Sequence, residues 1–576
     1  MDIPQLDSKQ LVVDGCRRLT GPSLVWNHSG AILDILIEDI DADEVLACWY
    51  RQINAVLEKA GWSDPQLTHR RFENGFSLLL AAPIDQLYSA LSALETAWYF
   101  CACEILGIEA ESTDALIDSI VDEMRDEKND ALIALQNAAA DNGVDFLVDD
   151  DVVFVGHGRG SQSFQMDRLP DPAEVEWSSV HDIPVALITG TNGKSTSVRI
   201  LDAIARAAER VSGITSTDFV RVGDEILDQG DYSGPGGARL LLRDPRLEVA
   251  FLEVARGGLL RRGLSVRRAA AALVTNVAND HLGQYGVNNM AALTATKFVV
   301  ARGLAENGVL VVNADDAGMV EYLASNPHPD LCWFGIERSN PVIEQQLANQ
   351  GQCCFTENGE IIRFDGKEFH SICPIDAVPM TLNGAARHNV QNALGAVGVA
   401  SAMGFDDAQI RAGLENFHSD ESDNPGRMNI FELPNSIKVI VDFAHNAHGV
   451  AAVVDTAGRM PAKHKWALFG SAGDRSDAEI AAIADGVCAI EPDRVVITEL
   501  ETYLRGREPG EVSAIMKRAC LENGLAPKQI HVAESPLAGV RHALEQMQPG
   551  DLGLFLVLAD RDQIVDYLHS LADQAS

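Results

Sequence analysis

A glycine-rich turn, "ITGTNGKSTS" (188–197), follows a short apolar run and precedes a long amphipathic segment, 195–211. These flanks have the patterns of a buried strand and a helix. Glycines let a backbone wrap closely around phosphates, and a helix N-terminus adds partial positive charge. Lys194 would reach the β- and γ-phosphates of a nucleotide, and the Ser195 hydroxyl would ligate Mg²⁺. We therefore predict a nucleotide site, although Ile188 stands where the usual spacing puts the first glycine.

The string T-G-T-N-G-K-S within this turn resembles the phosphate loop of the Mur ligase superfamily, whose members join an amino group to a carboxylate while splitting ATP. The resemblance implies ATP and Mg²⁺ as cofactors. The nucleotide-binding residues that it implies in the loop are Gly190, Thr191, Asn192, Gly193, Lys194, Ser195 and Thr196.

Such a ligase must bring a carboxylate oxygen to the γ-phosphate, so it needs dense positive charge beside the loop. Glu253 ends an apolar strand-like run, "VAFLE", and His281 follows the next such run in "ALVTNVANDH". Lys297, in "ALTATKFVV", is expected to start a helix. The resemblance implies that Ser195 and Glu253 hold one Mg²⁺ and that His281 helps to hold a second, bridged by a carbamylated Lys297. Lys194, Glu253, His281 and Lys297 are thus the candidate catalytic residues.

Two later blocks resemble other parts of a Mur ligase ATP site. "GAARHNVQNALGA" (384–396) resembles the segment beside the adenine, which implicates His388, Asn389 and Asn392. "NPGRMNIFE" followed by "VIVDFAHNAHG" resembles the hinge into the third domain. There Arg427 is expected to contact the ATP phosphates when the domains close, and Asp442 to accept hydrogen bonds from the ribose. A salt bridge at a domain boundary is the alternative for Arg427.

Longer strings resemble the Mur-like half of the cyanophycin synthetase family, among them "LEVARGGLLRRGL" (252–264), "TNVANDHLG" (275–283) and "YLRGREPGEV" (503–512). In that family this half adds arginine to the β-carboxylate of a backbone aspartate. The resemblance implies an amino acid and a carboxylate, peptide-like acceptor as substrates, and a homo-oligomer. Candidates for the amine site are Asp474, Arg475, Arg505 and Arg507.

Cyanophycin synthetases carry an ATP-grasp domain before the Mur-like half. Here "VVFVGHGRGSQSFQM" (152–166) resembles only the start of that domain, and a strand-like run begins again at Val185. The protein is therefore not expected to extend a peptide backbone alone, and a separate ATP-grasp ligase is a candidate partner. Two alternatives stay open: a folylpolyglutamate or peptidoglycan-precursor type of Mur ligase, and a non-catalytic nucleotide-binding partner of another ligase.

The composition excludes several other classes. Acidic residues outnumber basic ones, 84 to 45, which gives a formal charge of −39 and disfavours binding to nucleic acid or anionic membranes. No apolar run approaches the roughly 20 residues of a membrane span, and the N-terminus lacks the order of a secretory signal. The 10 cysteines form no CxxC pair and are expected to be free thiols in a reducing cytoplasm.

The order of elements predicts an α/β protein of three Mur ligase-like domains. From Val185 onward, continuous apolar runs alternate with amphipathic segments, which indicates parallel sheets covered on both faces. We expect an α+β N-terminal domain at 1–165, with a strand at 30–40 and a helix at 84–107. A linker at 166–182, a central phosphate-loop ATPase domain at 183–423 and a Rossmann-like C-terminal domain at 424–576 follow.

Overall fold

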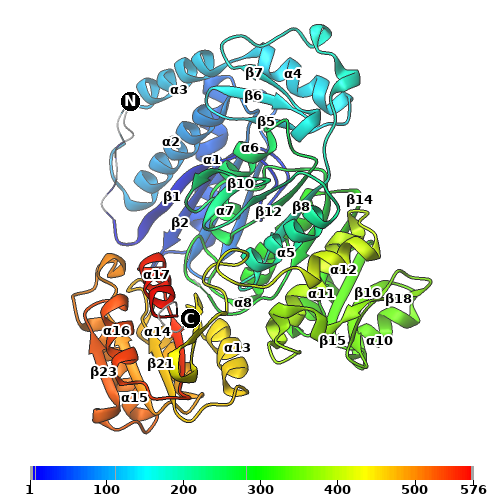
Figure 1. Ribbon diagram of the computed structural model, residues 1–576. Coiled ribbons are helices and arrows are strands. Elements are labelled where there is room, and N and C mark those ends of the chain that lie inside the picture. Colours follow the sequence, from blue (N-terminus) through cyan, green and yellow to red (C-terminus); the bar gives the residue numbers. More distant parts are fainter. Residues whose placement is uncertain (1–3, 5, 7, 111, 281, 573–576) are drawn as a thin grey trace.

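The computed structural model describes residues 4, 6, 8–110, 112–280 and 282–572 (Figure 1). Within these residues the strands form four sheets, which follow one another along the chain. Among the described helices, none combines the length and the apolar composition that a membrane span requires.

The N-terminal sheet is antiparallel, with strand order β1-β2-β4-β3, and packs against two long helices. The predicted strand and helix near the start of the chain are both present, as β2 and α2. Helix α1 contributes Trp49, which is fully buried beside Leu33 and Phe76 of the sheet. The elements are β1 (Leu11–Leu19), β2 (Gly30–Ile37), α1 (Ala42–Ala60), β3 (Leu67–Phe72), β4 (Gly75–Ala81) and α2 (Leu87–Leu106).

A small three-stranded sheet connects this region to the rest of the chain. The elements are α3 (Thr113–Glu127), α4 (Asp130–Asp141), β5 (Phe146–Val148), β6 (Val152–Val155) and β7 (Gln162–Gln165). Val175 and Val180, in the segment expected to be a linker, pack in one hydrophobic cluster with Leu132 and Val153. Part of the segment 166–182, which was expected to be a linker, therefore packs against α4 and the small sheet.

The central sheet has 11 strands in the order β11-β10-β9-β12-β8-β13-β14-β15-β16-β17-β18. The strands from β9 to β16 are parallel, and antiparallel strands extend both edges. The strands are β8 (Val185–Thr189), β9 (Ser212–Thr215), β10 (Phe219–Val222), β11 (Glu225–Gln229), β12 (Val249–Glu253), β13 (Ala269–Val274), β14 (Leu304–Asn313), β15 (Leu331–Glu337), β16 (Gln352–Glu357), β17 (Glu360–Phe364) and β18 (Phe369–Pro374).

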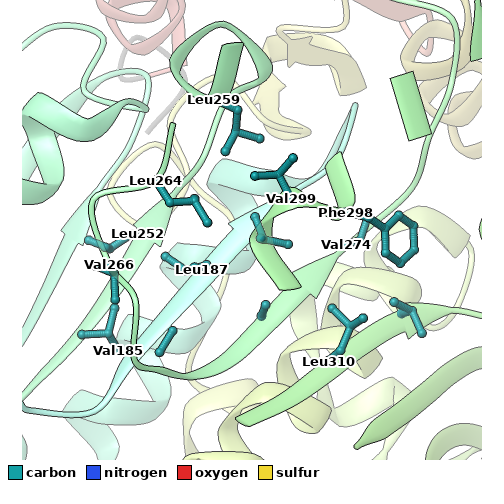
Figure 2. Close-up of a cluster of buried hydrophobic side chains, with 14 of the residues drawn as sticks. Val185, Leu187, Leu252, Leu259, Leu264, Val266, Val274, Phe298, Val299 and Leu310 are labelled. Atoms are coloured by element: carbon teal, nitrogen blue, oxygen red, sulfur yellow. The ribbon is translucent and has the colours of Figure 1, made fainter. Parts of the chain in front are cut away.

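Both faces of the central sheet are covered at its middle strands, which explains why β8, β12 and β13 are apolar over most of their length. In β8, Val185 and Leu187 point into one hydrophobic cluster, whereas Ala186 and Ile188 point into another. Figure 2 shows the first cluster, with Leu187 beside Leu252 of the neighbouring strand β12. The helices of this region are α5 (Lys194–Ala207), α6 (Pro235–Leu242), α7 (Arg256–Arg262), α8 (Met290–Lys297), α9 (Ala317–Ser325), α10 (Pro341–Ala348), α11 (Arg387–Ala402) and α12 (Asp407–Glu415).

The C-terminal region holds a six-stranded sheet in the order β19-β20-β24-β21-β22-β23, parallel except for the β19–β20 pair. It forms the separate lobe coloured yellow to red in Figure 1. Its elements are β19 (Asn429–Leu433), β20 (Ile437–Asp442), α13 (Ala447–Gly458), β21 (Lys465–Phe469), α14 (Asp477–Cys488), β22 (Arg494–Thr498), α15 (Glu511–Glu522), β23 (Ile530–Ala533), α16 (Pro536–Gln546), β24 (Leu552–Leu556) and α17 (Arg561–Ala572).

A buried charge network joins the C-terminal lobe to the central region. Asp218, in the turn between β9 and β10, accepts from Arg199 of α5 at 2.5 Å and from Arg561 of α17 at 3.0 Å. Arg199 also donates to Asn424, in the connection between the lobes, at 2.9 Å. These contacts fix the C-terminal lobe so that the loops after β20 face the carboxyl ends of the central strands.

Candidate active site

The glycine-rich turn lies between β8 and α5, as predicted, and two of its glycines cannot be replaced without strain. Gly193 has φ +86°, and a Cβ there would lie 2.3 Å from Asn392 Oδ1. Gly190 has φ +145°, and a Cβ there would lie 1.8 Å from Thr275 Oγ1. Side chains from α11 and from the end of β13 thus pack directly on the backbone of the turn, where only glycine fits.

The end of strand β13 holds this turn in shape. Asn276 accepts from Thr191 N through its backbone oxygen and from Asn192 N through Oδ1, both at 2.9 Å. Thr275 Oγ1 donates to Asn192 O at 2.6 Å. The sequence analysis quoted Thr275 and Asn276 within a family string but gave them no role. Their polar side chains directly after an apolar strand are the signal that could have indicated one.

Lys194 begins helix α5, and its ammonium group bonds to the turn itself. Its Nζ donates to Gly190 O at 3.1 Å and to Thr191 O at 2.9 Å. The helix has Gly193 as its N-cap, makes no side-chain capping bond and carries no acidic residue in its first turn. The positive end of α5 and the Lys194 ammonium group therefore both suit an anion such as a phosphate.

Ser195 and Glu253 meet at the carboxyl ends of β8 and β12. Ser195 Oγ donates to Glu253 Oε2 at 2.8 Å and lies 3.4 Å from Thr217 Oγ1. Glu253 is 2% exposed, and its Oε1 has no hydrogen-bond partner among the residues that the structure describes. Burial raises the pKa of this carboxyl, and Lys194 opposes that rise. Carboxylate and hydroxyl oxygens are ligands that Mg²⁺ prefers, and an orphaned buried oxygen fits a missing cation. The side chains present therefore fit the predicted metal.

Lys297 is buried, at 4% exposure. It was expected to start a helix, whereas it is the last residue of α8 and the N-cap of a short 3-10 helix, Phe298–Gly303. Helix α8 begins earlier because the Asn289 side chain caps it by accepting from Ala292 N. Burial, together with the nearby Lys194, lowers the pKa of the Lys297 ammonium group well below its usual value. A neutral amine of this kind is what carbamylation needs. His281, its predicted companion, lies outside the described residues.

The predicted adenine-side residues lie at the start of α11, on the wall of the same cavity as the turn. Asn392 packs on Gly193, and its Nδ2 donates to Asn389 Oδ1 at 3.3 Å. Asn389 in turn donates to Met380 O at 2.9 Å. Burial lowers the pKa of His388 to about 4, so its imidazole is neutral near pH 7.

Arg427 and Asp442 reach the cavity from the connection between the lobes. The guanidinium of Arg427 lies over the Phe443 ring, 4.6 Å from its centroid. Asp442 accepts from Met428 N at 2.8 Å and from Ala444 N at 2.7 Å. The Asp442 carboxylate therefore links Met428, just before β19, to Ala444, just after β20. Arg427 forms no salt bridge among the described residues, which disfavours its structural alternative.

A polar contact that was not predicted from the sequence connects the two lobes beside the cavity. Asn192 of the turn and Asn446, the N-cap of α13, exchange hydrogen bonds of 3.2 and 3.0 Å through their amides. Asn192 Nδ2 also lies 2.9 Å from His448 Nδ1. Asn446 precedes a helical run, which is a recognisable capping signal in the sequence. Its pairing with Asn192, 254 residues away, could not be predicted from the sequence.

Of the four predicted amine-site residues, Arg475 is the one that contacts the central region in the described part of the chain. Arg475 is 8% exposed and lies 3.5 Å from Asp280, two residues after Ala278 of the segment that holds the turn. Arg505 pairs with Asp474 on the surface of the C-terminal lobe. Arg507 donates to Gly473 O at 2.9 Å and to Arg475 O at 2.8 Å, so it shapes the loop that presents Arg475.

The turn, Glu253, the start of α11 and the hinge together surround a cavity of about 540 Å³. Its lining includes Lys194, Ser195, His388, Arg427 and Asp442, which the sequence placed in one site. Helix α13 adds the further wall described above. Lys297 lies outside this lining, although Lys194 and Asp280 influence its pKa.

Family models match most of the region from the turn onward. Residues 188–400 match the Mur ligase middle domain, and residues 426–556 match the Mur ligase glutamate ligase domain. A solved structure of E. coli FolC in complex with DHPP and ADP shares the fold, with a TM-score of 0.50 and 19% identity over 67% of this chain and 89% of that one.

Curated relatives cover the same region. The cyanophycin synthetase of Geminocystis herdmanii (strain PCC 6308) is 34% identical over 372 residues, which are 65% of this chain and 41% of the relative. The UDP-N-acetylmuramoyl-L-alanyl-D-glutamate--2,6-diaminopimelate ligase of Syntrophomonas wolfei is 25% identical over 390 residues, 64% of this chain and 72% of the relative. The match to this cyanophycin synthetase therefore spans less than half of its length.

Proposed function

The chain belongs to the Mur ligase superfamily, and on that basis we propose that it is an ATP-dependent ligase that joins a carboxylate to the amino group of an amino acid. One observation carries the proposal: a buried Glu253 with an orphaned oxygen contacts Ser195, beside a lysine-bearing glycine turn that opens into a cavity. This arrangement suits the binding of a nucleoside triphosphate with Mg²⁺ better than it suits a purely structural role.

In the proposed reaction, an acceptor carboxylate oxygen attacks the γ-phosphate of ATP and ADP leaves. The amine then attacks the carbonyl carbon of the resulting acyl phosphate, and inorganic phosphate leaves as the amide forms. Mg²⁺, held by Ser195 and Glu253, would supply the positive charge that lets two anions meet. Lys194 and Arg427 would bind phosphate oxygens, and Lys194 would first give up its bonds to the turn.

The nucleoside would lie along the start of α11 and the hinge. His388 is neutral near pH 7 and so would contact a base without adding charge. Asn392 is fixed on Gly193 and would set the width of the pocket at the turn. Asp442 uses one lone pair of each oxygen on the backbone, which leaves the others for ribose hydroxyls.

An acidic acceptor is supported by the arginines of helix α7, which follows the strand that ends at Glu253. Helix α7 begins at Arg256, three residues after Glu253, and ends at Arg262. Burial and the nearby Arg18 and Arg239 lower the pKa of the Arg262 guanidinium. Such a concentration of like charge is unusual in a chain of formal charge −39 and suits a polyanionic chain, such as one of aspartates.

The direct test is a screen of single amino acids against acceptors that carry free aspartate carboxylates, with ADP release as the readout. We expect release that requires both the acceptor and the amine, with arginine as the first amine to examine. Release of ADP with no pair, at a protein concentration where ATP binding is measurable, would favour a non-catalytic nucleotide-binding partner instead.

A second experiment concerns the acceptor's backbone. The small sheet and the segment 166–182 lead directly to β8, so the described residues between the N-terminal sheet and the turn form no ATP-grasp fold. We propose that another ligase, of ATP-grasp type, prepares the acceptor. Purified protein that elongates polyaspartate unaided would contradict this part of the proposal without contradicting the ligase chemistry.

A further inference from the structure

Two buried side chains and one partly buried side chain converge where the small sheet meets the central region, away from the cavity described above. Asp145 lies just before β5, His157 follows β6, and Asp182 lies three residues before β8. Each offers one ligand atom, and these atoms all lie within 4.8 Å of one another. The three residues come from segments that only the fold brings together.

His157 is 1% exposed, and neither of its ring nitrogens has a hydrogen-bond partner within the described ranges of the chain. Its Nε2 lies 3.5 Å from Asp145 Oδ2, and its Nδ1 lies 3.7 Å from Asp182 Oδ1. These separations are too long for good hydrogen bonds. Two ligands on one tetrahedral zinc ion, each about 2.0–2.1 Å from it, are roughly 3.4 Å apart. One ion can bind only one of the two ring nitrogens. The 3.5 Å between Nε2 and Asp145 Oδ2 is close to this ligand spacing, and one ligand atom from each of the three residues lies within 4.8 Å of the others.

Backbone groups hold the two carboxylates in place but do not neutralise them. Asp145 N donates to both oxygens of Asp182, at 3.2 and 3.1 Å, and Arg267 N donates to Asp145 Oδ2 at 3.0 Å. The Arg267 side chain points elsewhere and donates to Asn27 O. Arg268 is half-exposed, and its Nε lies 3.7 Å from Asp182. A buried divalent cation would balance both carboxylates together.

We propose that Asp145, His157 and Asp182 form a structural site for a divalent metal ion, with Zn²⁺ as the ion that this donor set suits. One imidazole nitrogen and two carboxylate oxygens are ordinary zinc ligands. The ring nitrogen that does not bind the ion would carry the proton of the neutral imidazole. Asp145 also lines a cavity of about 510 Å³, from which a water molecule would complete the coordination.

The ion would tie two parts of the chain together. Asp145 and His157 flank strands of the small sheet, whereas Asp182 leads into β8 and so into the glycine turn. Holding these segments together would fix the N-terminal region relative to the site. The proposal concerns stability and does not depend on the ligase reaction.

The test uses the full chain, stripped with a chelator and then loaded with Zn²⁺ or Co²⁺. We expect one equivalent of retained zinc, a rise in the thermal midpoint on loading, and visible absorption of the cobalt form. His157→Gln and Asp182→Asn should lose all three effects. Glu253→Gln, which alters only the other candidate metal site, should keep them.

Two results would overturn the proposal. One is a wild-type chain that retains no more zinc than His157→Gln does. The other is a thermal midpoint that responds to pH but not to zinc, which would identify His157 as a protonated bridge between two carboxylates. If either variant fails to fold, the cobalt absorption of the wild-type chain, compared with Glu253→Gln, still decides the matter.

Discussion

Glu253 and Asp442 are both buried carboxylates at the carboxyl ends of parallel strands, and both line the same cavity. Their surroundings differ. Both oxygens of Asp442 accept from backbone N–H groups of the hinge, at 2.8 and 2.7 Å. The Glu253 carboxylate accepts from Ser195 through Oε2, but its Oε1 bonds to nothing among the described residues.

This difference separates a group kept for a ligand from a group that also builds the protein. A buried acceptor without a partner costs stability, so its presence needs an explanation such as a bound cation. Asp442 already contributes to the fold, because it joins the two ends of the hinge. Burial raises the pKa of both carboxyls, so position at a strand end and burial do not distinguish them. The hydrogen bonds that their carboxylate oxygens accept do distinguish them.

The largest expected effect comes from Glu253→Gln. We expect ATP turnover to fall by about 10³-fold or more, because a neutral amide cannot replace a carboxylate in charge stabilisation. The thermal midpoint should stay the same or rise, because a buried, uncompensated carboxylate is removed. Because Glu253 is 2% exposed, the isosteric substitution is chosen. Glu432→Gln, on the exposed side of β19, is the matched control and should change neither quantity.

Lys297→Met should lower turnover by roughly 10²-fold while stabilising the fold. The ammonium group is buried and its pKa is lowered by burial, so an apolar side chain of similar length fits the site at lower cost. Steady-state ADP release and thermal unfolding measure the two effects. Lys297→Arg separates the alternatives, because an arginine keeps the charge but cannot be carbamylated. Full activity in that variant would remove the carbamate from the account.

Asp442→Ala should show the opposite balance to Glu253→Gln. It leaves the N–H groups of Met428 and Ala444 without acceptors, so the C-terminal lobe should lose about 1–3 kcal/mol of stability. Turnover should fall by about tenfold, mainly through a higher KM for ATP. Chemical denaturation followed at the C-terminal lobe measures the first effect. A variant as stable as the wild type would show that the two carboxylates do not differ as described.

The smallest expected effect is on the free energy of unfolding at acidic pH. Burial lowers the pKa of His388 and His445 from 6.5 to about 4. Between these values the unfolded chain binds protons that the native chain does not, so the free energy of unfolding should decrease as the pH falls from about 6.5 to 4. Replacing both histidines by glutamine should flatten this dependence in thermal unfolding, whereas replacing the exposed His418 should not. An unchanged slope in the double variant would show that other groups set it.

Local patterns predicted the parts of the site that depend on neighbours in the chain. The strand, turn and helix around Lys194 were predicted because each has its own periodicity and the glycines mark the turn. The position of Glu253 followed from the end of an apolar run. The end of α8 at Lys297 was predicted wrongly, because the capping role of Asn289 was overlooked. The division into domains at 165, 182 and 423 stays a prediction.

Contacts between distant segments could not be predicted in this way. Asp218 and Arg561 are 343 residues apart, and nothing near either residue indicates the other. The pairing of Asn192 with Asn446 depends likewise on how the two lobes meet. The state of each buried oxygen, which distinguishes Glu253 from Asp442, depends on side-chain geometry and has no counterpart in the sequence.

The transfer of oxygen from the acceptor to phosphate tests the central claim most directly. With an acceptor labelled with ¹⁸O in its carboxylate, the proposed reaction places one labelled oxygen in the inorganic phosphate and leaves one in the amide. We expect mass spectrometry to find one label in the phosphate for each amide formed, and neither product with Glu253→Gln. Amide formation with unlabelled phosphate would contradict the attack of a carboxylate on ATP at this site.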